Sequence, residues 1–487
     1  MVPRERSELI LPTLASRRFD LPDQERFAVV SGDYNPVHLD PILARRTQAA
    51  APVVHGVHLL LWALDALASN QPGLPRPHGL RARFHKFVRV GDCAEVLLTH
   101  RGSQDAKLQV CVGAAPMIQV TLIFEDSKPK SQDLAVFSTE QISRPPVPLD
   151  LRLEQMSKRS GHFPFATSPN VVASMFPAAA QWFGARRVAA LAASSHLVGM
   201  ICPGLHSIFR GLSLEVCTET DPQDSLAFRV TETDPRFGLV RQDIAGGGLA
   251  GTVESFARVP PVSQATMQSL LGLVDATEFA GTVALVVGGS RGLGELTSKL
   301  VATGGGHVVI TYRVGRTDAE RVAQEITQAG GTAEIVAYDA RRPATEQLID
   351  LPDPPTHAYY FATPLISRDQ SEVFSPERFH DFSAIYVDGF WHLAMALRAR
   401  RNQLSMFYPS SVFVSDRRRN MTEYAMAKAA GETLCANMNL SLAPLHVTVN
   451  RLPRLATDQT ASIVTAETPS AVATLLPIVR EVQSWPR

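Results

Sequence analysis

The stretch VALVVGGSRGLGE, residues 283–295, decides the fold of the C-terminal part of this chain. Its apolar half predicts a buried strand, and Gly288, Gly292 and Gly294 follow where that strand turns into a helix. Glycines at such a turn let a pyrophosphate approach the helix N-terminus, where free N–H groups and the helix dipole favour an anion. The stretch therefore predicts a βαβ unit with a dinucleotide site.

The alternation continues downstream with a strand at HVVITYR (307–313), an amphipathic helix at DAERVAQEITQAG (318–330) and a strand at TAEIVAYD (332–339). This rhythm predicts a doubly wound parallel sheet. An NAD enzyme carries an acid for the ribose 2′-hydroxyl after the second strand, whereas Arg313 stands there in this chain. Arg313, helped by Arg291 in the glycine turn, suits a 2′-phosphate. We therefore expect NADPH.

A second motif, YAMAK, places Tyr424 and Lys428 four residues apart on one face of a predicted helix. A lysine ammonium stabilises a nearby tyrosinate, so the phenol can exchange a proton with a carbonyl oxygen. Ser411, at the end of a predicted strand, can hydrogen-bond the same oxygen. A Tyr and a Lys at this spacing also occur on ordinary exposed helices, but the glycine turn upstream favours the catalytic interpretation.

Together these features resemble the short-chain dehydrogenases/reductases over residues 276 to about 460. The resemblance rests on the glycine turn, the acid after the third strand (Asp339) and the Ser…YxxxK set. It implies a Rossmann-type α/β fold and places Ser411, Tyr424 and Lys428 in the catalytic positions. The residues that it places at the cofactor are Gly288, Ser290, Arg291, Gly292, Leu293, Gly294, Arg313, Asp339, Tyr424 and Lys428.

The chain also departs from that family. Val287 replaces a Thr, YFATP (360–364) replaces the NAG-type turn, and Tyr386 falls where an Asn is expected. After VTVNRLPRLATDQT (447–460), the region that covers the substrate and the last strand are shortened. A reductase of reduced or altered activity is therefore an open alternative.

Near the other end, SGDYNPVHLD (31–40) holds Asp33 and His38 five residues apart. Pro36 biases Asn35 toward an extended conformation, which predicts a turn entering a short helix. A carboxylate and an imidazole that share one water can add or remove water at an enoyl thioester. Gly56, at the start of the next predicted helix, offers a free N–H to the thioester oxygen. The alternative is a capping Asp and a surface His.

This motif, with HGVHLLLWAL and RFHKFVRVGD downstream, strongly resembles the MaoC-type (R)-specific enoyl-CoA hydratases and dehydratases over residues 20 to 125. The resemblance implies the α+β hot-dog fold, with Asp33 and His38 as the catalytic pair, Asn35 as their support and Gly56 as the oxyanion donor. No metal is implied.

The middle of the chain repeats the order of a long helix (168–200) and several strands, which predicts a second, divergent hot-dog unit. It lacks the GDxNPxH motif but holds His196 and His206. We expect it to complete a double hot dog, with catalysis by His206 as the minor alternative. Paired prolines at 143–150 and 258–264 separate the predicted domains. These are 1–145 (hydratase), 150–260 (second hot dog) and 275–487 (reductase).

Composition narrows the function further. The 47 basic and 47 acidic residues balance, which does not favour nucleic acid. No apolar run approaches the roughly 20 residues that span a membrane. Five scattered cysteines without CxxC spacing indicate a reducing compartment, so we expect a cytoplasmic protein.

The two motifs together predict NADPH-dependent reduction of a 3-oxoacyl thioester and dehydration of the 3-hydroxyacyl product. The acyl group would be carried by acyl carrier protein or coenzyme A, and both resemblances imply a homodimer. Two alternatives are an oxidative hydratase and dehydrogenase that uses NAD, and a monofunctional dehydratase with a degenerate reductase scaffold.

Overall fold

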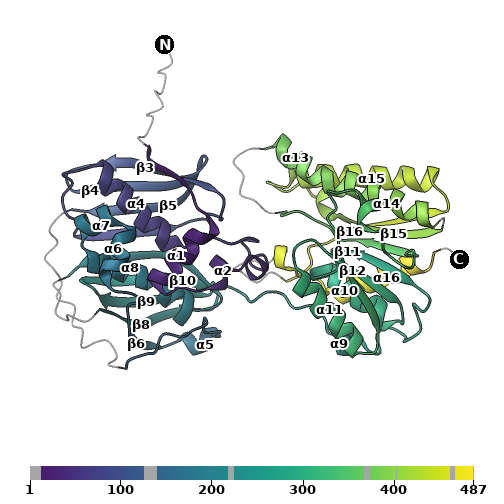
Figure 1. The fold of residues 1–487 in the computed structure, drawn as a ribbon, viewed down its shortest axis with the longest axis horizontal. Coiled ribbons are helices and arrows are strands. Elements are labelled where there is room, and N and C mark those ends of the chain that lie inside the picture. The colour runs from purple at the N-terminus through teal and green to yellow at the C-terminus, as the bar shows by residue number, and fades with distance from the viewer. Residues whose placement is uncertain are drawn as a thin grey trace, which may run out of the picture. The chain divides into compact units, whose positions relative to one another are not determined.

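The computed structural model describes residues 13–124, 140–217, 224–366, 373–401, 403–460 and 467–485. The chain divides after Pro260 into two compact units. The first is built on a ten-stranded antiparallel sheet and the second on a six-stranded parallel sheet (Figure 1). Within the described ranges, no helix has the length and apolar character needed to cross a bilayer.

The ten-stranded sheet consists of two halves, and each half is formed by its own continuous stretch of the sequence. The strands of the first half are β1 (Thr13–Arg18), β2 (Gly79–Phe84), β3 (Cys93–Arg101), β4 (Asp105–Val112) and β5 (Ala115–Ile123). Those of the second half are β6 (Ser160–Pro164), β7 (Ser207–Val216), β8 (Ser225–Asp234), β9 (Leu239–Gly246) and β10 (Leu249–Ala257). The strand order is β1-β3-β4-β5-β2-β7-β10-β9-β8-β6, so the second half reverses the order of the first.

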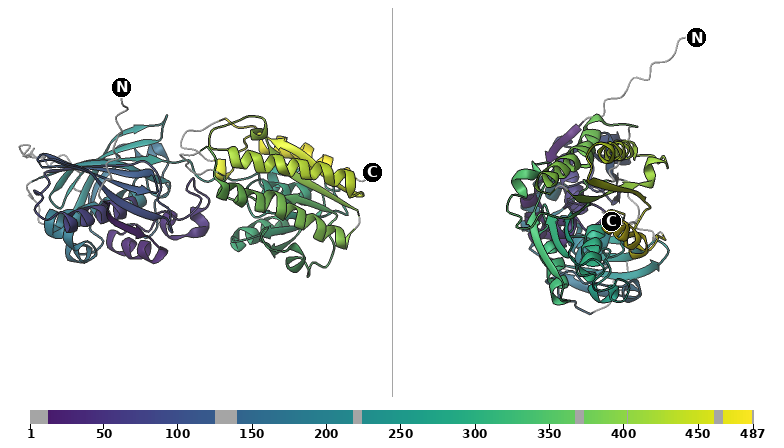
Figure 2. Two further views of the ribbon diagram at one scale, coloured as in Figure 1. Left: turned by 90° about the horizontal axis from the view of Figure 1, so that it is seen from above. Right: turned by 90° about the vertical axis from the view of Figure 1, so that its right-hand side faces the viewer.

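The halves join where β2 and β7 pair antiparallel, with Gly79 opposite Glu215 and Arg83 opposite Gly211. We call this pairing the seam. Helices lie on one face of the sheet, which curves around them (Figure 2). Those of the first half are α1 (Leu21–Ser31), α2 (Pro36–Leu39), α3 (Pro41–Ala44) and α4 (Gly56–Asn70). Those of the second are α5 (Leu153–Met156), α6 (Pro169–Met175), α7 (Pro177–Phe183) and α8 (Ala185–His196), followed by a π-helical turn (Leu197–Ile201).

The long helix predicted over 168–200 is therefore interrupted. Pro177 starts α7 because proline lacks the N–H that would continue α6. Gly184 separates α7 from α8 with a φ of 105°, which other residues avoid.

Both halves contribute to one hydrophobic core, in which α4 is buried on nearly all sides. Its continuous apolar sequence fits this position between the sheet and the helices α7 and α8. The first half thus wraps its strands around one long helix, and the predicted hot-dog fold is confirmed for it. The second half has the same order of elements.

The parallel sheet of the second unit has the order β13-β12-β11-β14-β15-β16. Its strands are β11 (Val283–Val287), β12 (His307–Tyr312), β13 (Thr332–Ala337), β14 (His357–Tyr360), β15 (Leu404–Ser411) and β16 (Leu445–Leu452). The order reverses between β11 and β14, and such a switch point is where doubly wound sheets bind ligands. The predicted doubly wound fold is confirmed. In the part of the chain that is described, no strand follows β16, in line with the shortened end expected from the sequence.

Helices cover both faces of this sheet and form two separate cores. One core includes side chains of α10 (Gly292–Thr303), α11 (Arg316–Gln328) and α16 (Ala471–Gln483). The other includes side chains of α13 (Pro376–Ser383), α14 (Phe390–Arg400) and α15 (Thr422–Ser441). Shorter elements are α9 (Met267–Leu270), α12 (Ala344–Gln347), a π-helical turn (Ala384–Gly389) and 3-10 turns at Val412–Val414 and Asp458–Thr460.

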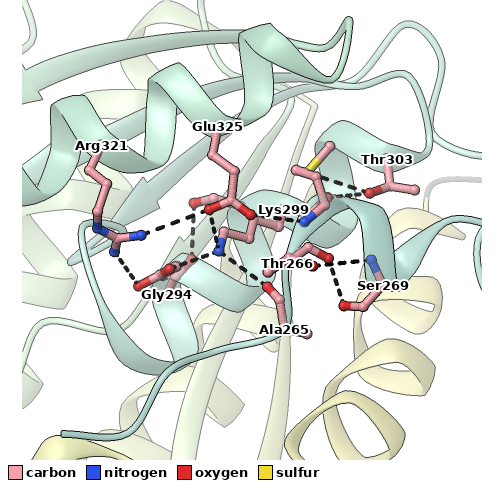
Figure 3. A network of polar contacts seen from close by, with 11 residues as sticks. Ala265, Thr266, Ser269, Gly294, Lys299, Thr303, Arg321 and Glu325 are labelled. Carbon is pink, nitrogen blue, oxygen red and sulfur yellow. Dashed lines mark hydrogen bonds and ion pairs between the residues drawn. The ribbon is translucent and has the colours of Figure 1, made fainter.

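A buried ionic network joins the start of the second unit to the helices α10 and α11 (Figure 3). Lys299 on α10 is 1% exposed, and its Nζ lies 2.8 Å from Glu295, 2.8 Å from Glu325 and 3.1 Å from the carbonyl oxygen of Ala265. Glu325 also accepts the backbone N–H of Met267 at 2.9 Å. Three acceptors therefore surround the amino group, which offsets the cost of burying it.

Candidate active sites

Asp33 lies in a short extended segment between two helices. α1 ends at Gly32, whose φ of 81° is left-handed, and Asn35 caps the start of α2. The Asp33 side chain is buried, and its carboxylate accepts hydrogen bonds from the Asn35 N–H at 3.2 Å and from the Ser195 hydroxyl at 2.7 Å. The two donors hold the carboxylate in one orientation.

His38 lies on α2, and one of its ring nitrogens is within 4.8 Å of an Asp33 carboxylate oxygen. Its Nδ1 is 2.8 Å from the carbonyl oxygen of Val53, so we assign the ring proton to Nδ1 and the lone pair to Nε2. Burial lowers the pKa of His38, and the negative charge of Asp33 partly offsets this effect. A neutral imidazole with a free Nε2 can accept a proton from a substrate.

His55 stacks against His38. The two rings stack with centroids 3.7 Å apart. Burial is the main reason why the pKa of His55 lies well below its usual range. Its Nδ1 is 3.0 Å from Gln24 Oε1, and its Nε2 is 3.0 Å from the Asp33 carbonyl oxygen. Asp33, His38 and His55 together have the composition of a metal site, but both His55 nitrogens already face protein oxygens.

The second half of the sheet completes the surroundings of Asp33. Ser195, near the end of α8, donates its hydroxyl to Asp33 Oδ2. Gly199, in the following π-helical turn, packs so closely that a Cβ atom there would lie 2.2 Å from Asp33 Oδ1. Sequence reasoning missed both residues, because nothing in the local pattern links positions so far apart.

Asn35 and His196 tie the halves together at the same place. The Asn35 Nδ2 donates to the carbonyl oxygens of Gly199 at 2.8 Å and Gly204 at 3.2 Å. The Nδ1 of His196 lies 2.6 Å from the carbonyl oxygen of Gly32. His206, the histidine weighed for catalysis from the sequence, instead lies 3.4 Å from Asp150. Asn35 thus holds the two halves together beside Asp33, and its supporting role in catalysis stays a prediction.

The Asp33 side chain opens onto a cavity with an empty volume of about 750 Å³, which is open to solvent. His38, Gly56 and Ser195 line the same cavity. Much of the remaining wall is apolar and includes Leu59, Phe84, Ile118, Val198, Ile208 and Phe209. An apolar cavity with few polar groups at one place is typical of a small-molecule site.

Gly56 begins α4, directly after His55. As the first residue of the helix, it has no intrahelical acceptor for its N–H, and the helix dipole adds positive potential there. A Cβ atom at this position would lie 2.9 Å from a ring carbon of Phe84, so the tight packing favours glycine. The N–H at this lining position can stabilise an oxyanion.

The glycine turn of the second unit follows β11, as predicted. Gly288 and Gly292 adopt φ values of 77° and 59°. A Cβ atom on Gly294 would lie 2.3 Å from the Gly288 carbonyl oxygen, so the close turn requires glycine. Ser290 is buried and Leu293 half-buried beside the start of α10. This cradle fits the pyrophosphate of a dinucleotide at the helix N-terminus.

The charged residues predicted at the cofactor have different surroundings. Arg291 Nη1 lies 3.2 Å from Asp458 Oδ2, so this arginine forms an ion pair within the chain. Arg313 follows β12 and is exposed. Asp339 follows β13 and accepts the backbone N–H of Arg341 at 3.0 Å. A role for both arginines at a 2′-phosphate stays a prediction.

The structure brings Ser411, Tyr424 and Lys428 together. Ser411 is the last residue of β15, and the other two lie on the first turns of α15. Burial raises the pKa of Tyr424, and a hydrogen bond with Ser411 partly offsets this effect. Lys428 Nζ donates to the Pro409 carbonyl oxygen at 2.6 Å. Burial lowers the pKa of Lys428 to about 7.

Tyr386, at the expected Asn position, lies in the π-helical turn between α13 and α14 and is buried. The Lys428 Nζ is 3.8 Å from the centre of its ring, a cation–π contact. The Tyr386 ring also meets Tyr424 edge-on at 5.7 Å, and its hydroxyl is 2.5 Å from the Thr363 hydroxyl. An aromatic ring therefore covers the lysine where the family has a small amide.

Comparison with known proteins gives a separate match for each unit. Residues 13–121 match the model of the MaoC like domain, and residues 282–447 match the model of the KR domain. An (R)-specific enoyl-CoA hydratase from Aeromonas caviae is 38% identical over 87 residues, which cover 17% of this chain and 65% of the hydratase.

Two further relatives each match part of the chain. The peroxisomal hydratase-dehydrogenase-epimerase of Saccharomyces cerevisiae is 33% identical over 81 residues, 17% of this chain and 9% of that protein. The uncharacterized oxidoreductase YgfF of Escherichia coli is 30% identical over 180 residues, 34% of this chain and 73% of YgfF. The chain thus spans just under two thirds of the hydratase and a small fraction of the peroxisomal protein. With the fold and both sites, these matches show that the chain joins a MaoC-like hot-dog hydratase/dehydratase domain to a ketoreductase domain of the short-chain dehydrogenase/reductase family.

Proposed function

We propose that this chain reduces a 3-oxoacyl thioester to a 3-hydroxyacyl thioester with NADPH and removes water from that product to give the trans-2-enoyl thioester. The observation that carries the proposal is that Asp33, His38 and Gly56 line one cavity with apolar walls. The product of the reductase chemistry is the substrate of the dehydratase chemistry, which explains why both sites occur on one chain.

In the dehydration step, the Nε2 of His38 accepts the proton from C2 of the acyl group. The Asp33 carboxylate stabilises the imidazolium that forms, which then gives the proton to the leaving C3 hydroxyl on the same face. Charge that develops on the thioester oxygen meets the Gly56 N–H. Water leaves, and the C2–C3 double bond remains.

In the reduction step, the Tyr424 phenol donates its proton to the carbonyl oxygen that Ser411 holds. The Lys428 ammonium favours the tyrosinate that results. A bound nicotinamide cofactor supplies the hydride. Burial raises the pKa of Tyr424, so the phenol is protonated before the step and has a proton to donate.

The preference for NADPH rests on Arg313, which follows β12 where NAD enzymes carry an acid. The alternative is the oxidative direction with NAD, and the partial similarity to a protein named hydratase-dehydrogenase-epimerase is the reason to test it. Comparing initial rates with NADPH and NADH in both directions separates the two. Faster oxidation with NAD would overturn the NADPH-dependent proposal.

The substrate carrier, coenzyme A or acyl carrier protein, and a homodimeric state are further parts of the proposal. The main test is to incubate the chain with NADPH and 3-oxoacyl thioesters on both carriers, and to follow products by mass spectrometry. We expect a gain of two hydrogens followed by a loss of water. If the chain dehydrates its substrate but does not bind NADPH, it is a monofunctional dehydratase. The Tyr386 ring over Lys428 would then help to explain the inactive reductase. Light scattering tests the dimer.

A further inference from the structure

Arg258 is a charged residue in the hydratase cavity that the proposed chemistry does not use. It directly follows β10, is 8% exposed and lines the cavity with Asp33 and His38. Its Nη2 donates to the Leu205 carbonyl oxygen at 3.1 Å. Its Nε is buried and makes no hydrogen bond to any described residue. Most of the guanidinium's donor capacity is therefore unused.

The charge of Arg258 also lacks a counter-ion. No acidic side chain in the described ranges pairs with it, and burial lowers its pKa to about 10. Asp33 is the one acid among the described lining residues, and its carboxylate is held by Ser195 and Asn35. A buried charge without a partner is costly, so a site that keeps one commonly pairs it with a ligand.

We propose that Arg258 binds an anionic oxygen group of the thioester, either a carboxylate on the acyl chain or a phosphate on its carrier, while C2 and C3 lie against Asp33 and His38. This inference rests on the proposed dehydratase function and narrows its substrate class. A guanidinium binds both groups in a bidentate manner. The burial of Arg258 in an apolar-walled cavity favours the acyl carboxylate, because carrier phosphates remain in water.

The test compares four 3-hydroxyacyl thioesters in which the acyl chain ends in a methyl group or a carboxylate and the carrier is coenzyme A or phosphate-free pantetheine. Dehydration kcat/KM is measured for the unaltered chain and for Arg258→Met. For an acyl carboxylate, we expect Arg258→Met to lower kcat/KM about 100-fold on both carboxylate substrates and less than about 3-fold on both methyl substrates. For a carrier phosphate, the loss appears on both coenzyme A thioesters and on neither pantetheine thioester.

Two outcomes overturn the inference. One is that Arg258→Met leaves kcat/KM unchanged for all four substrates. The other is that it lowers kcat/KM equally for all four, as the loss of a purely structural residue would. Arg258→Lys keeps the charge and should restore part of the lost activity. Arg236→Met, in an exposed ion pair outside the cavity, is the matched control for an Arg→Met change.

A binding measurement separates this inference from the proposed function. Calorimetry with an unreactive saturated ω-carboxyacyl-coenzyme A, compared with its methyl-ended analogue, needs no turnover. If the carboxylate-ended analogue binds more tightly than the methyl-ended one and Arg258→Met abolishes this difference, the acyl site is supported even if no thioester is dehydrated. Loss of binding of both analogues alike supports the carrier site, provided that the phosphate-free analogues bind equally to both proteins. Equal binding of every analogue by both proteins overturns the inference.

Discussion

The hydratase and reductase sites differ in how far along the chain their parts lie. Asp33 is held by Ser195, from the other side of the seam between β2 and β7. Ser411, Tyr424 and Lys428 come from one strand and the helix that follows it. The first site therefore has an intact motif that depends on distant support, and the second has a compact motif with an altered neighbour at Tyr386.

This difference teaches that an intact motif and an intact site are separate properties. The GDxNPxH motif is complete in the sequence, yet the orientation of its carboxylate depends on a serine from the second half. The Ser…YxxxK set is also complete, yet Lys428 is covered by an aromatic ring. We expect the hydratase to be sensitive to substitutions far from its motif, and the reductase to depend mainly on its immediate surroundings.

The largest effect should come from Asp33→Asn or His38→Ala. Each removes one member of the proton-transfer pair, so dehydration should fall about 1,000-fold or more, while reduction is unchanged. The absorbance of the enoyl thioester measures the first reaction, and NADPH consumption measures the second. Asp40→Asn, which keeps a capping side chain at the start of α3, is the control. Full dehydration in either active-site variant would refute the assigned pair.

Tyr424→Phe should produce the reciprocal result. Loss of the phenolic proton donor should lower 3-oxoacyl reduction about 100- to 1,000-fold, with dehydration preserved. Fluorescence titration of NADPH checks that the cofactor site is intact. If both reactions fall together, the two sites are not independent and the comparison fails.

Ser195→Ala tests the support across the seam. A hydrogen bond to a charged group contributes about 1.5–3 kcal/mol, so dehydration should fall about 10- to 100-fold. The neighbouring Ser194 is also buried but donates to the Leu191 carbonyl oxygen, which makes Ser194→Ala a matched control. Equal rates for the two variants would show that the second half does not position Asp33.

The smallest effect concerns the pH dependence of reduction. Lys428 has a pKa of about 7, so its ammonium is present below that pH and is lost as the pH rises. The reduction rate should therefore fall several-fold between pH 6 and pH 8. Tyr386→Asn admits water to Lys428 and should move this decline upward by about one pH unit, because hydration favours the charged form.

Tyr386→Phe keeps the ring over Lys428 and is the control, with an unchanged midpoint expected. Rates with NADPH and a 3-oxoacyl thioester between pH 5.5 and 9.5 provide the measurement. If the reduction rate of Tyr386→Asn declines over the same pH range as that of the unaltered chain, the Tyr386 ring does not set the pKa of Lys428.

The sequence predicted the local parts of both sites well. Pro36 and the helix at Gly56 define the hydratase turn, and the glycine positions define the dinucleotide turn, because both depend on short-range backbone geometry. What could not be predicted depends on the register across the seam, which places Ser195 and Gly199 beside Asp33. The segment HLVGMICPG (196–204), in the second half of the first unit, lacks the GDxNPxH motif, so nothing in it predicted its contact with Asp33.

The seam also determines how small a working piece of this protein can be. A fragment that ends after β5 would expose the backbone groups of β2 along Gly79–Phe84, an unpaired edge that invites aggregation. The same fragment would lose Ser195, one of the two groups that hold the Asp33 carboxylate, and the cavity wall that the second half supplies. For expression or directed evolution of the dehydratase alone, residues 13–260 are therefore the smallest module that keeps the site whole, although the stretch that matches the MaoC like domain, residues 13–121, occupies less than half of it.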